Sequence, residues 1–480
     1  MELSRLAGLR PASVFSYFEQ LCAIPHGSGN TKNISDFVVS FAKEQGLSYI
    51  QDETNNVILF KPASVGYEDH PPVIIQGHLD MVCEKDADCP LDMDMDGLDV
   101  THDGSYVFAR GTTLGGDDGI AVAYAMALLA DKTAIHPPLE VILTVDEETG
   151  MDGAAAIDVS MLKGRLLLNI DSEEEGIFTV SCAGGATATL TLPAQRRPVY
   201  GPCIKLSVSG LQGGHSGVEI HKNLANANKV MGELLGRIQA IMPICLTSFR
   251  GGNKDNAIPR SCEASFVALG MGPERINTII EELQQEIRSR YDEPEALIQG
   301  ENVEALGGNA MSAEQTAKVI ALLNAAPNGV QAMSEEIPDL VQTSLNLGIA
   351  ALEEDMVLTF SVRSSVNGEK EALLKKLEQL VLFYEGSYTR MGDYPAWEYK
   401  KDSRLRDTMV AVYRRMYRQE PQIVAIHAGL ECGLLSEKLP GLDCVSIGPE
   451  MHDIHTSRER LGIASVERTW QFVCEILKAL

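Results

Sequence analysis

The sequence lacks any apolar stretch long enough to cross a membrane, and it is short of basic residues. No run of about eighteen apolar residues occurs, and the first residues do not combine a basic segment with an apolar one, as a secretion signal does. The 40 Lys and Arg residues are outnumbered by 67 Asp and Glu residues, which gives a formal net charge of −27. Such a charge repels nucleic acid and anionic lipid alike. We therefore expect a cytoplasmic protein that binds neither nucleic acid nor membranes.

Several common binding and catalytic motifs are also absent from the sequence. The ten cysteines include no CxxC pair, which predicts reduced thiols and neither a disulfide framework nor a cysteine-ligated zinc site. A phosphate-binding loop and an HExxH zinc helix are also missing. The acids of 92–103 have the spacing of a calcium loop, but the loop ends in Asp103, has Asp99 where an apolar residue belongs and lacks flanking helices. We predict an acidic surface hairpin there.

The length of the chain bounds its domain organisation. At 480 residues it exceeds one compact core, so two domains, or one domain with a large insertion, are expected. Its 45% hydrophobic and 22% charged residues are typical of a folded globular protein. From the changes in sequence pattern we predict a catalytic domain formed by 1–184 and 396–480. An inserted α+β domain at 185–395, with room for two subdomains, interrupts it.

Short β-rich apolar runs alternate with helix patterns in the first part of the chain, which predicts an α/β fold whose sheet has a substantial parallel part. The predicted strands lie within 57–60, 71–80, 139–148 and 165–174, and the predicted helices at 31–46 and 117–131. Further helices are predicted at 222–240, 274–290, 312–325, 368–384, 403–418 and 465–479. Open α/β sheets bind ligands at the carboxyl ends of their strands, so polar residues there are candidates for a site.

Polar residues end three of these runs: His78 and Asp80, then Glu147 and Glu148, then Asp171. At a spacing of two along a strand, Asp80 shares a side with His78 and can orient its imidazole. Strand alternation turns Glu147 and Glu148 to different sides, so that one could bind a metal while the other faces the attacking water. Each residue alone also fits an ordinary polar strand end or solvated turn.

Asp117 and Asp118 follow a glycine-rich turn, GTTLGGDDGI, where a helix begins. Carboxylates are favoured at a helix N-terminus, so a purely structural role explains them as well. His455, in EMHDIH, follows an apolar strand, although a lone histidine is more often structural. Together these residues supply what a two-metal hydrolase needs: imidazole and carboxylate ligands, one bridging carboxylate and another to accept the proton of water.

In this order the motifs QGHLDMVCEK, GTTLGGDDGI, TVDEETGMDGA, NIDSEEEG, GGHSGVEI, NAIPR and MHDIHTSRER resemble the M20 metallopeptidases, and among them the aminoacyl-histidine dipeptidases, over essentially the whole chain. The resemblance implies a zinc-peptidase-like catalytic domain with a central mixed β-sheet flanked by helices, and an inserted lid domain that also serves dimerisation. It implies a homodimer that hydrolyses dipeptides by a metal-activated water, with a preference for Xaa-His substrates such as carnosine. Two zinc ions per subunit are implied, and Mn²⁺ or Co²⁺ would suit the same ligands.

The resemblance also implies roles for the residues of the catalytic domain. Asp80 resembles the aspartate that orients the ligand histidine, and Glu147 resembles the general base. The implied metal ligands are His78 and Asp171 for one ion, Glu148 and His455 for the other, and Asp117 as the bridge. Many relatives carry an amide where this chain has Asp118, which leaves open which aspartate bridges, and the last motif is HTSRER instead of the frequent HSP-type run.

The inserted domain holds the residues that the resemblance assigns to the substrate. His215 resembles a histidine that stabilises the oxyanion of the tetrahedral intermediate, and in several relatives it comes from the partner subunit. Asn256, Arg363 and Gly429 resemble residues that bind the substrate's backbone and C-terminal carboxylate, for which an arginine fork and backbone amides are suited. Each also fits an ordinary structural role.

Two alternatives to a dipeptidase stay open. The first is another hydrolase on the same scaffold, namely an aminoacylase, a deacetylase or an aminopeptidase. The second is a metal-binding scaffold without catalysis. Glu147 argues against the scaffold, since a protein that only binds metal needs no base beside its ligands.

Overall fold

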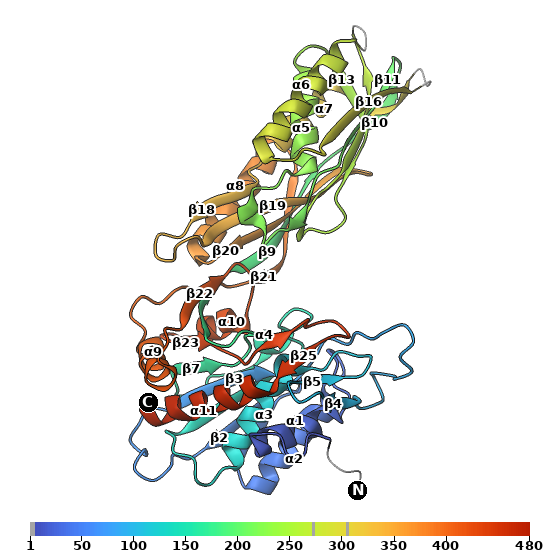
Figure 1. Cartoon of the computed structure of the whole chain (residues 1–480). Helices are drawn as coiled ribbons and strands as arrows, with labels where there is room; N and C mark the ends of the chain where they lie inside the picture. The colour runs from blue at the N-terminus through green and yellow to red at the C-terminus, as the bar shows by residue number, and fades with distance from the viewer. Residues whose placement is uncertain (1–4, 271–273, 304–306) are drawn as a thin grey trace. The chain divides into compact units, whose positions relative to one another are not determined.

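The computed structural model describes residues 5–270, 274–303 and 307–480, and the chain forms two compact units (Figure 1). Unit 1 consists of Met1–Ser181, Tyr399–Ala425 and Leu430–Leu480. Unit 2 consists of Cys182–Glu398 and Ile426–Gly429. Each unit has its own sheet and its own helices, and each is described separately.

Unit 1 is built on an eight-stranded mixed sheet in the order β1-β2-β6-β3-β7-β23-β8-β22. The strands are β1 (Ser48–Gln51), β2 (Val57–Lys61), β3 (Val73–His78), β6 (Leu139–Thr144), β7 (Leu166–Asn169), β8 (Ile177–Cys182), β22 (Gln422–Ile426) and β23 (Asp443–Ser446). The four central strands β6, β3, β7 and β23 run parallel, whereas β1, β2 and β8 pair antiparallel to their neighbours. This mixed sheet confirms the predicted α/β fold.

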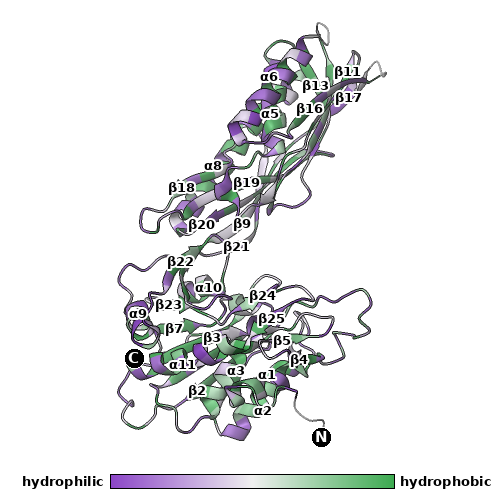
Figure 2. Cartoon of the chain, viewed as in Figure 1, coloured by the Kyte–Doolittle hydropathy of each residue, from purple (hydrophilic) through white to green (hydrophobic). Residues whose placement is uncertain are grey.

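The central strands are apolar on both sides because helices cover both faces of the sheet. Every residue of β3, β6, β7 and β23 is buried, which is typical of parallel strands in α/β proteins. Figure 2 shows these strands as the hydrophobic centre of unit 1. The helices of unit 1 are α1 (Ala12–Cys22), α2 (Lys32–Gln45), α3 (Gly116–Ala130), α4 (Asp152–Ala156), α9 (Arg404–Tyr417), α10 (Glu431–Lys438) and α11 (Ile463–Ala479).

A second, four-stranded sheet in unit 1 joins distant parts of the chain. Its strands, in the order β24-β25-β5-β4, are β24 (Met451–His452), β25 (Arg460–Gly462), β5 (Tyr106–Ala109) and β4 (Val100–His102). The antiparallel pair of β4 and β5 forms a hairpin within the acidic segment 92–109, with Asp103 accepting backbone hydrogen bonds in the turn. Pairing of β25 with β5 brings the C-terminal loop beside this hairpin.

Unit 2 holds a nine-stranded antiparallel sheet in the order β16-β11-β15-β13-β19-β20-β9-β21, with β18 beside β19. Its strands are β9 (Gly184–Leu192), β11 (Cys203–Ser209), β13 (Ile244–Gly251), β15 (Cys262–Ala268), β16 (Leu297–Val303), β18 (Gly329–Met333), β19 (Val341–Leu352), β20 (Met356–Ser364) and β21 (Ser387–Tyr394). Burial alternates along β9 and β11, so one face of the sheet is covered and the other is partly open. Two short pairs complete the unit: β10 (Arg196–Val199) with β17 (Gly308–Met311), and β12 (Gly214–His215) with β14 (Ala257–Ile258).

The covering layer of unit 2 consists of α5 (Ala227–Gln239), α6 (Glu274–Tyr291), α7 (Ala313–Ala325) and α8 (Asn367–Phe383), and a short 3₁₀ helix η1 spans Ile220–Lys222. The prediction of one helix over 222–240 is wrong at its start. Asn226 is the N-cap of α5, since its side chain accepts hydrogen bonds from the backbone N–H groups of Asn228 and Lys229. Within the described ranges, none of the helices is both long and apolar enough to pass through a lipid bilayer.

Candidate metal centre

The candidate site lies at the carboxyl ends of the parallel strands of unit 1. His78, the last residue of β3, stands opposite Thr144, the last residue of β6. Gln76 of β3 stands opposite Asn169, the last residue of β7. Because these strands end at the same edge of the sheet, the loops that follow them meet there.

His78 is the buried centre of the first half of this site. Its side chain is 1% exposed, and its Nε2 lies 3.1 Å from Asp117 Oδ1 and 3.6 Å from Asp171 Oδ1. On the other side of the ring, Nδ1 lies 3.0 Å from the backbone oxygen of Asp80 and 3.5 Å from the Asp80 carboxylate. These contacts keep the ring's Nε2 directed at the two carboxylates.

Asp117 connects the two halves of the site. Its Oδ1 faces His78, and its Oδ2 lies 3.1 Å from Nε2 of His455. The same His455 nitrogen lies 2.8 Å from Oε1 of Glu148. One carboxylate therefore stands between two imidazoles, each of which has a further carboxylate beside it.

The turn at the start of α3 directs Asp117 towards both histidines, whereas Asp118 lies beside His78 and Asp171. Gly115 has a φ of +67°, which favours glycine, and a Cβ at this position would lie 2.8 Å from Met81 Sδ, so the Met81 side chain would have to shift. Asp118 is fully buried, and its Oδ2 accepts a hydrogen bond from the backbone N–H of His78 at 3.2 Å. Of the two aspartates, Asp117 alone contacts both histidines.

Asp80 supports the loop that follows β6. Its Oδ1 accepts the backbone N–H of Glu147 at 3.1 Å and its Oδ2 that of Glu148 at 3.4 Å. The hydroxyl of Ser28 also donates to Oδ2 at 2.7 Å. Asp80 thus ties the two glutamates to the loop that carries His78.

Glu147 and Glu148 do not lie on a strand, so the expected strand alternation is wrong for this pair. The strand β6 ends at Thr144, Asp146 adopts a left-handed conformation with a φ of 56°, and residues 147–150 form a turn. In this turn Glu148 contacts His455 at 2.8 Å, and an oxygen of each glutamate lies within 4.8 Å of a His78 nitrogen and of the other glutamate.

The side chains of the cluster shift one another's pKa as crowded, buried charges do. Burial raises the pKa of Glu147 to about 9, an effect that His78 opposes and the charge of Asp171 increases. Burial likewise raises the pKa of Asp171 to about 6, although its hydrogen bond with His78 opposes the rise. Hydrogen bonds with Asp117 and then Glu148 raise the pKa of His455 to about 10. Carboxylates that resist ionisation in this way are stabilised by bound cations.

The donor set fits divalent metal ions. Three overlapping groups have ligand atoms within 4.8 Å of one another: His78, Asp118 and Asp171; His78, Glu147 and Glu148; and Asp117, Glu148 and His455. Carboxylate oxygen and imidazole nitrogen suit zinc, manganese and cobalt. Among the described residues, no acid of 92–103 belongs to such a group.

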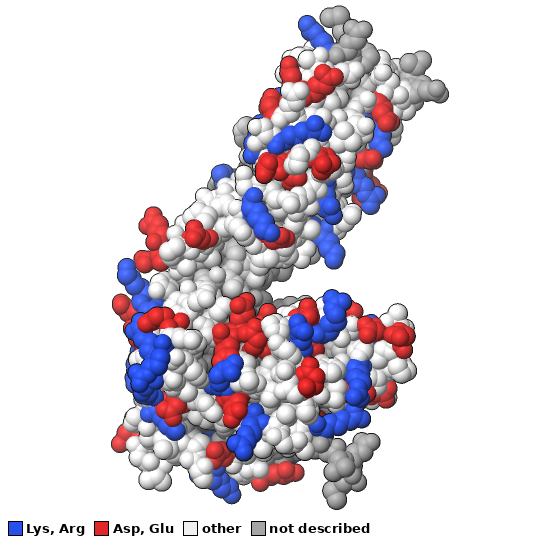
Figure 3. Space-filling model, viewed as in Figure 1, with Lys and Arg blue, Asp and Glu red and all other residues white. Residues whose placement is uncertain are grey.

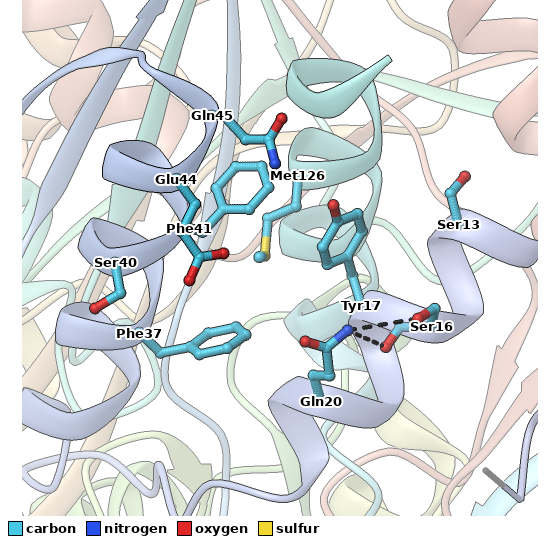
Figure 4. A pocket seen from close by; sticks show the side chains of 10 residues that line it. All are labelled: Ser13, Ser16, Tyr17, Gln20, Phe37, Ser40, Phe41, Glu44, Gln45 and Met126. Atoms are coloured by element: carbon cyan, nitrogen blue, oxygen red, sulfur yellow. Dashed lines mark hydrogen bonds between the residues drawn. The ribbon is translucent and has the colours of Figure 1, made fainter.

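Acidic side chains also gather on the surface near this edge of unit 1, around α10 and β24 (Figure 3). A different hollow, of about 390 Å³, lies between α1, α2 and α3 (Figure 4). It is lined by aromatic, serine and glutamine side chains around Met126, and Glu44 is the single acid among them. That hollow has no set of groups able to hold a metal, so the strand-end cluster is the candidate site.

In unit 2, His215 is held in one tautomer. The backbone N–H groups of Gly217 and Val218 donate to its Nδ1 at 3.1 and 3.2 Å, which leaves the proton on Nε2. Burial, and then the charge of Arg363, lower the pKa of His215. His215 is therefore a neutral hydrogen-bond donor at neutral pH.

The other predicted substrate residues lie in the same part of unit 2. Arg363 of β20 donates to the hydroxyl of Tyr394 at 3.3 Å, and its Nε has no hydrogen-bond partner among the described residues. A Cβ on Gly429 would lie 2.7 Å from the ring of Tyr394, so the chain passes close to that ring. The exposed Asn256 precedes Ala257, the strand partner of His215.

Two buried acids near the site are not among the residues predicted from the sequence. Glu431, fully buried, accepts hydrogen bonds at 2.6 Å from the side chains of Gln76 and Thr144 beneath the cluster. Glu459, 3% exposed, binds backbone N–H groups of the turn before α3. In the sequence Glu459 belongs to the charged run TSRER, which resembles a solvated surface segment. A search for charged residues close to a predicted ligand is the one signal that could have found it.

A mixed α/β unit with a cluster of imidazole and carboxylate groups at its strand ends is typical of metal-dependent hydrolases. Residues 74–479 match the family model Peptidase family M20/M25/M40. The chain therefore belongs to this peptidase family, which confirms the predicted family and the predicted peptide-bond hydrolase.

Individual relatives are similar to the chain over nearly its full length. The chain is 36% identical to the cytosol non-specific dipeptidase of Escherichia coli (strain K12), over 100% of this chain and 99% of that protein. Among solved structures, aminoacylhistidine dipeptidase from Vibrio alginolyticus matches with a TM-score of 0.94 and 34% identity, over 99% of this chain and 98% of that one. Aminopeptidase PepT from Bacillus cereus shares the fold, with a TM-score of 0.56 and 14% identity over 98% of this chain and 99% of that one.

Proposed function

We propose that this protein is a cytoplasmic di-zinc dipeptidase that prefers Xaa-His substrates. The observation that carries the proposal is the Asp117 carboxylate standing between His78 and His455, with Asp171 and Glu148 beside them. The names of the two full-length relatives, a non-specific dipeptidase and an aminoacylhistidine dipeptidase, support dipeptides as the substrate class.

We propose that five residues of the cluster form two sets of ligands. His78 and Asp171 would hold one zinc ion, Glu148 and His455 the other, and Asp117 both. When bound, such ions polarise the peptide carbonyl and lower the pKa of water. The protein's own part is to hold the ligands: Asp80 fixes the turn of Glu147 and Glu148 by accepting both of their backbone N–H groups.

Glu147 is the proposed general base. Its side chain lies beside His78, and it makes no hydrogen bond to His455, in contrast to Glu148. In the metal-free fold burial raises the pKa of Glu147 to about 9, which keeps the side chain protonated at neutral pH. The positive charge of bound metal ions would lower that pKa and so free the carboxylate to accept the proton of water. Glu147 would take the proton of the attacking water and pass it to the amine of the leaving amino acid.

The proposed substrate residues come from unit 2. The two backbone N–H groups on Nδ1 leave the hydrogen of His215 on Nε2. Through this Nε2–H, His215 would donate to the oxygen of the peptide carbonyl as charge develops on it. Arg363 has a free Nε and suits the C-terminal carboxylate, with Asn256 and Gly429 binding the substrate backbone. We propose unit 2 as the lid and dimerisation domain; the homodimer stays a prediction that sedimentation analysis would test.

One experiment separates this function from its two alternatives. The metal-loaded protein is incubated with carnosine, Gly-His, a tripeptide and an N-acetyl amino acid, and the release of free amine or acid is followed. We expect cleavage of the two dipeptides, faster than of the tripeptide. Cleavage of the N-acetyl compound alone would establish an aminoacylase or deacetylase, and no cleavage of any compound would favour a metal-binding scaffold.

A further inference from the structure

Glu459 is a buried carboxylate of unit 1 that binds backbone N–H groups. Glu459 accepts hydrogen bonds from four consecutive backbone N–H groups of the turn before α3. Its Oε2 accepts those of Leu114 at 2.7 Å and Gly115 at 3.1 Å. Its Oε1 accepts those of Gly116 at 2.7 Å and Asp117 at 3.4 Å. A carboxylate that takes four N–H groups fixes the path of that backbone.

The turn is shaped around this carboxylate. The left-handed Gly115 lets neighbouring N–H groups converge on one point, as in the backbone nests that bind anions. A Cβ on Gly116 would lie only 3.1 Å from Glu459 Oε1 and 3.2 Å from Met451 Sδ. The residues around the Glu459 carboxylate thus pack closely against it, and water has little access to it.

Glu459 also belongs to the second loop of the site. It follows His455 by four residues, in a compact turn where the N–H of Glu459 donates to the backbone oxygen of Thr456 at 3.1 Å. The Thr456 hydroxyl in turn donates to the backbone oxygen of Asp453 at 2.7 Å. The carboxylate therefore joins the loop that carries His455 to the turn that carries Asp117.

We propose that Glu459 is a positioning residue for the metal centre, setting the separation between the Asp117 carboxylate and the His455 imidazole. The inference rests on the proposed metal site. Without the carboxylate, four buried N–H groups lose their acceptor and the turn relaxes towards other partners. Metal affinity should fall at both positions, because Asp117 is the proposed ligand at both. Loss of residues that orient ligands typically weakens metal binding by about 10- to 100-fold.

The test compares Glu459→Gln with a matched variant, Glu140→Gln, in the full-length protein. Glu140 is also a buried carboxylate, 5% exposed, and it accepts the backbone N–H groups of Lys163 and Gly164 at 2.9 Å each. It is the second residue of β6 and so lies near the amino end of a strand whose carboxyl end reaches the site. Co²⁺ is titrated into metal-free protein, and its visible absorption and its dissociation constants are measured together with the melting temperature.

We expect Glu459→Gln to bind both Co²⁺ ions about 10- to 100-fold more weakly and with an altered absorption band, whereas Glu140→Gln binds them as the wild type does. Binding by Glu459→Gln within twofold of wild type, or equal weakening in Glu140→Gln, would overturn the inference. If Glu459→Gln does not fold, Glu459→Asp decides by the same measure, since its carboxylate is one methylene too short to reach all four N–H groups. Wild-type protein that binds no Co²⁺ would reject the metal centre itself, a result distinct from tight binding by the variants.

Discussion

Replacement of Glu147 by glutamine distinguishes its proposed role as general base from a role as metal ligand. The amide has the shape of the carboxylate but cannot accept the proton of water, and the backbone N–H of residue 147 keeps its bond to Asp80. The fold should not suffer, because burial already disfavours a charge on Glu147, as its raised pKa indicates. We expect kcat to fall by roughly 10²- to 10⁴-fold, or about 3–5 kcal/mol in the barrier, with KM little changed.

The control is the neighbouring Glu148→Gln, which changes the same chemical group in the same turn. Glu148 contacts His455 at 2.8 Å, so this variant should lose the ion of that half of the site and with it the metal content measured by elemental analysis. Steady-state kinetics on Gly-His and metal analysis are performed on both variants. Normal turnover by Glu147→Gln would place the base elsewhere, and loss of metal from it would make Glu147 a ligand.

Three further predictions concern stability. Chelation should lower the melting temperature, and metal at 100 times its Kd should restore about 2.7 kcal/mol per site, as calorimetry would show; an unchanged melting temperature would contradict the site. Glu431 is buried with its pKa raised to about 8, so its neutral form stabilises the metal-free fold fully below pH 4.5, and this contribution is lost as pH rises to about 8. In urea unfolding, Glu431→Gln should therefore show a free energy of unfolding that varies with pH by several kcal/mol less than that of the wild type. An unaltered pH dependence would contradict this role of Glu431. Gly115→Ala should cost about 1–3 kcal/mol and weaken metal binding, since a φ of +67° is strained for alanine and its Cβ would displace the sulfur of Met81; equal melting temperatures would refute this.

The sequence predicts most of the framework of unit 1 because its signals are local. The runs at 71–80 and 139–148 contain the parallel strands β3 and β6, since buried parallel strands are continuous apolar segments, and the run at 57–60 covers β2 except for Lys61. The helix predicted at 117–131 is α3 shifted by one residue. Strand ends then locate the candidate site, because the carboxyl ends of parallel strands meet at one edge.

What the sequence does not predict depends on tertiary contacts. The positions of Glu147 and Glu148 come from a left-handed Asp146 and a turn, not from strand alternation. The buried states of Glu431 and Glu459 depend on partners more than 280 residues away in the chain, Thr144 and the turn before Asp117. A charged residue whose partners are backbone N–H groups has no sequence pattern that marks it as buried. The sequence alone therefore predicts an exposed side chain.

The most direct test of the account is anomalous diffraction from crystals of the zinc-loaded protein. We expect two peaks in unit 1, one about 2.0–2.2 Å from ligand atoms of His78 and Asp171 and the other equally close to Glu148 and His455, with an Asp117 oxygen at each. A single peak, or peaks that Asp117 does not join, would contradict a dinuclear centre built on this carboxylate.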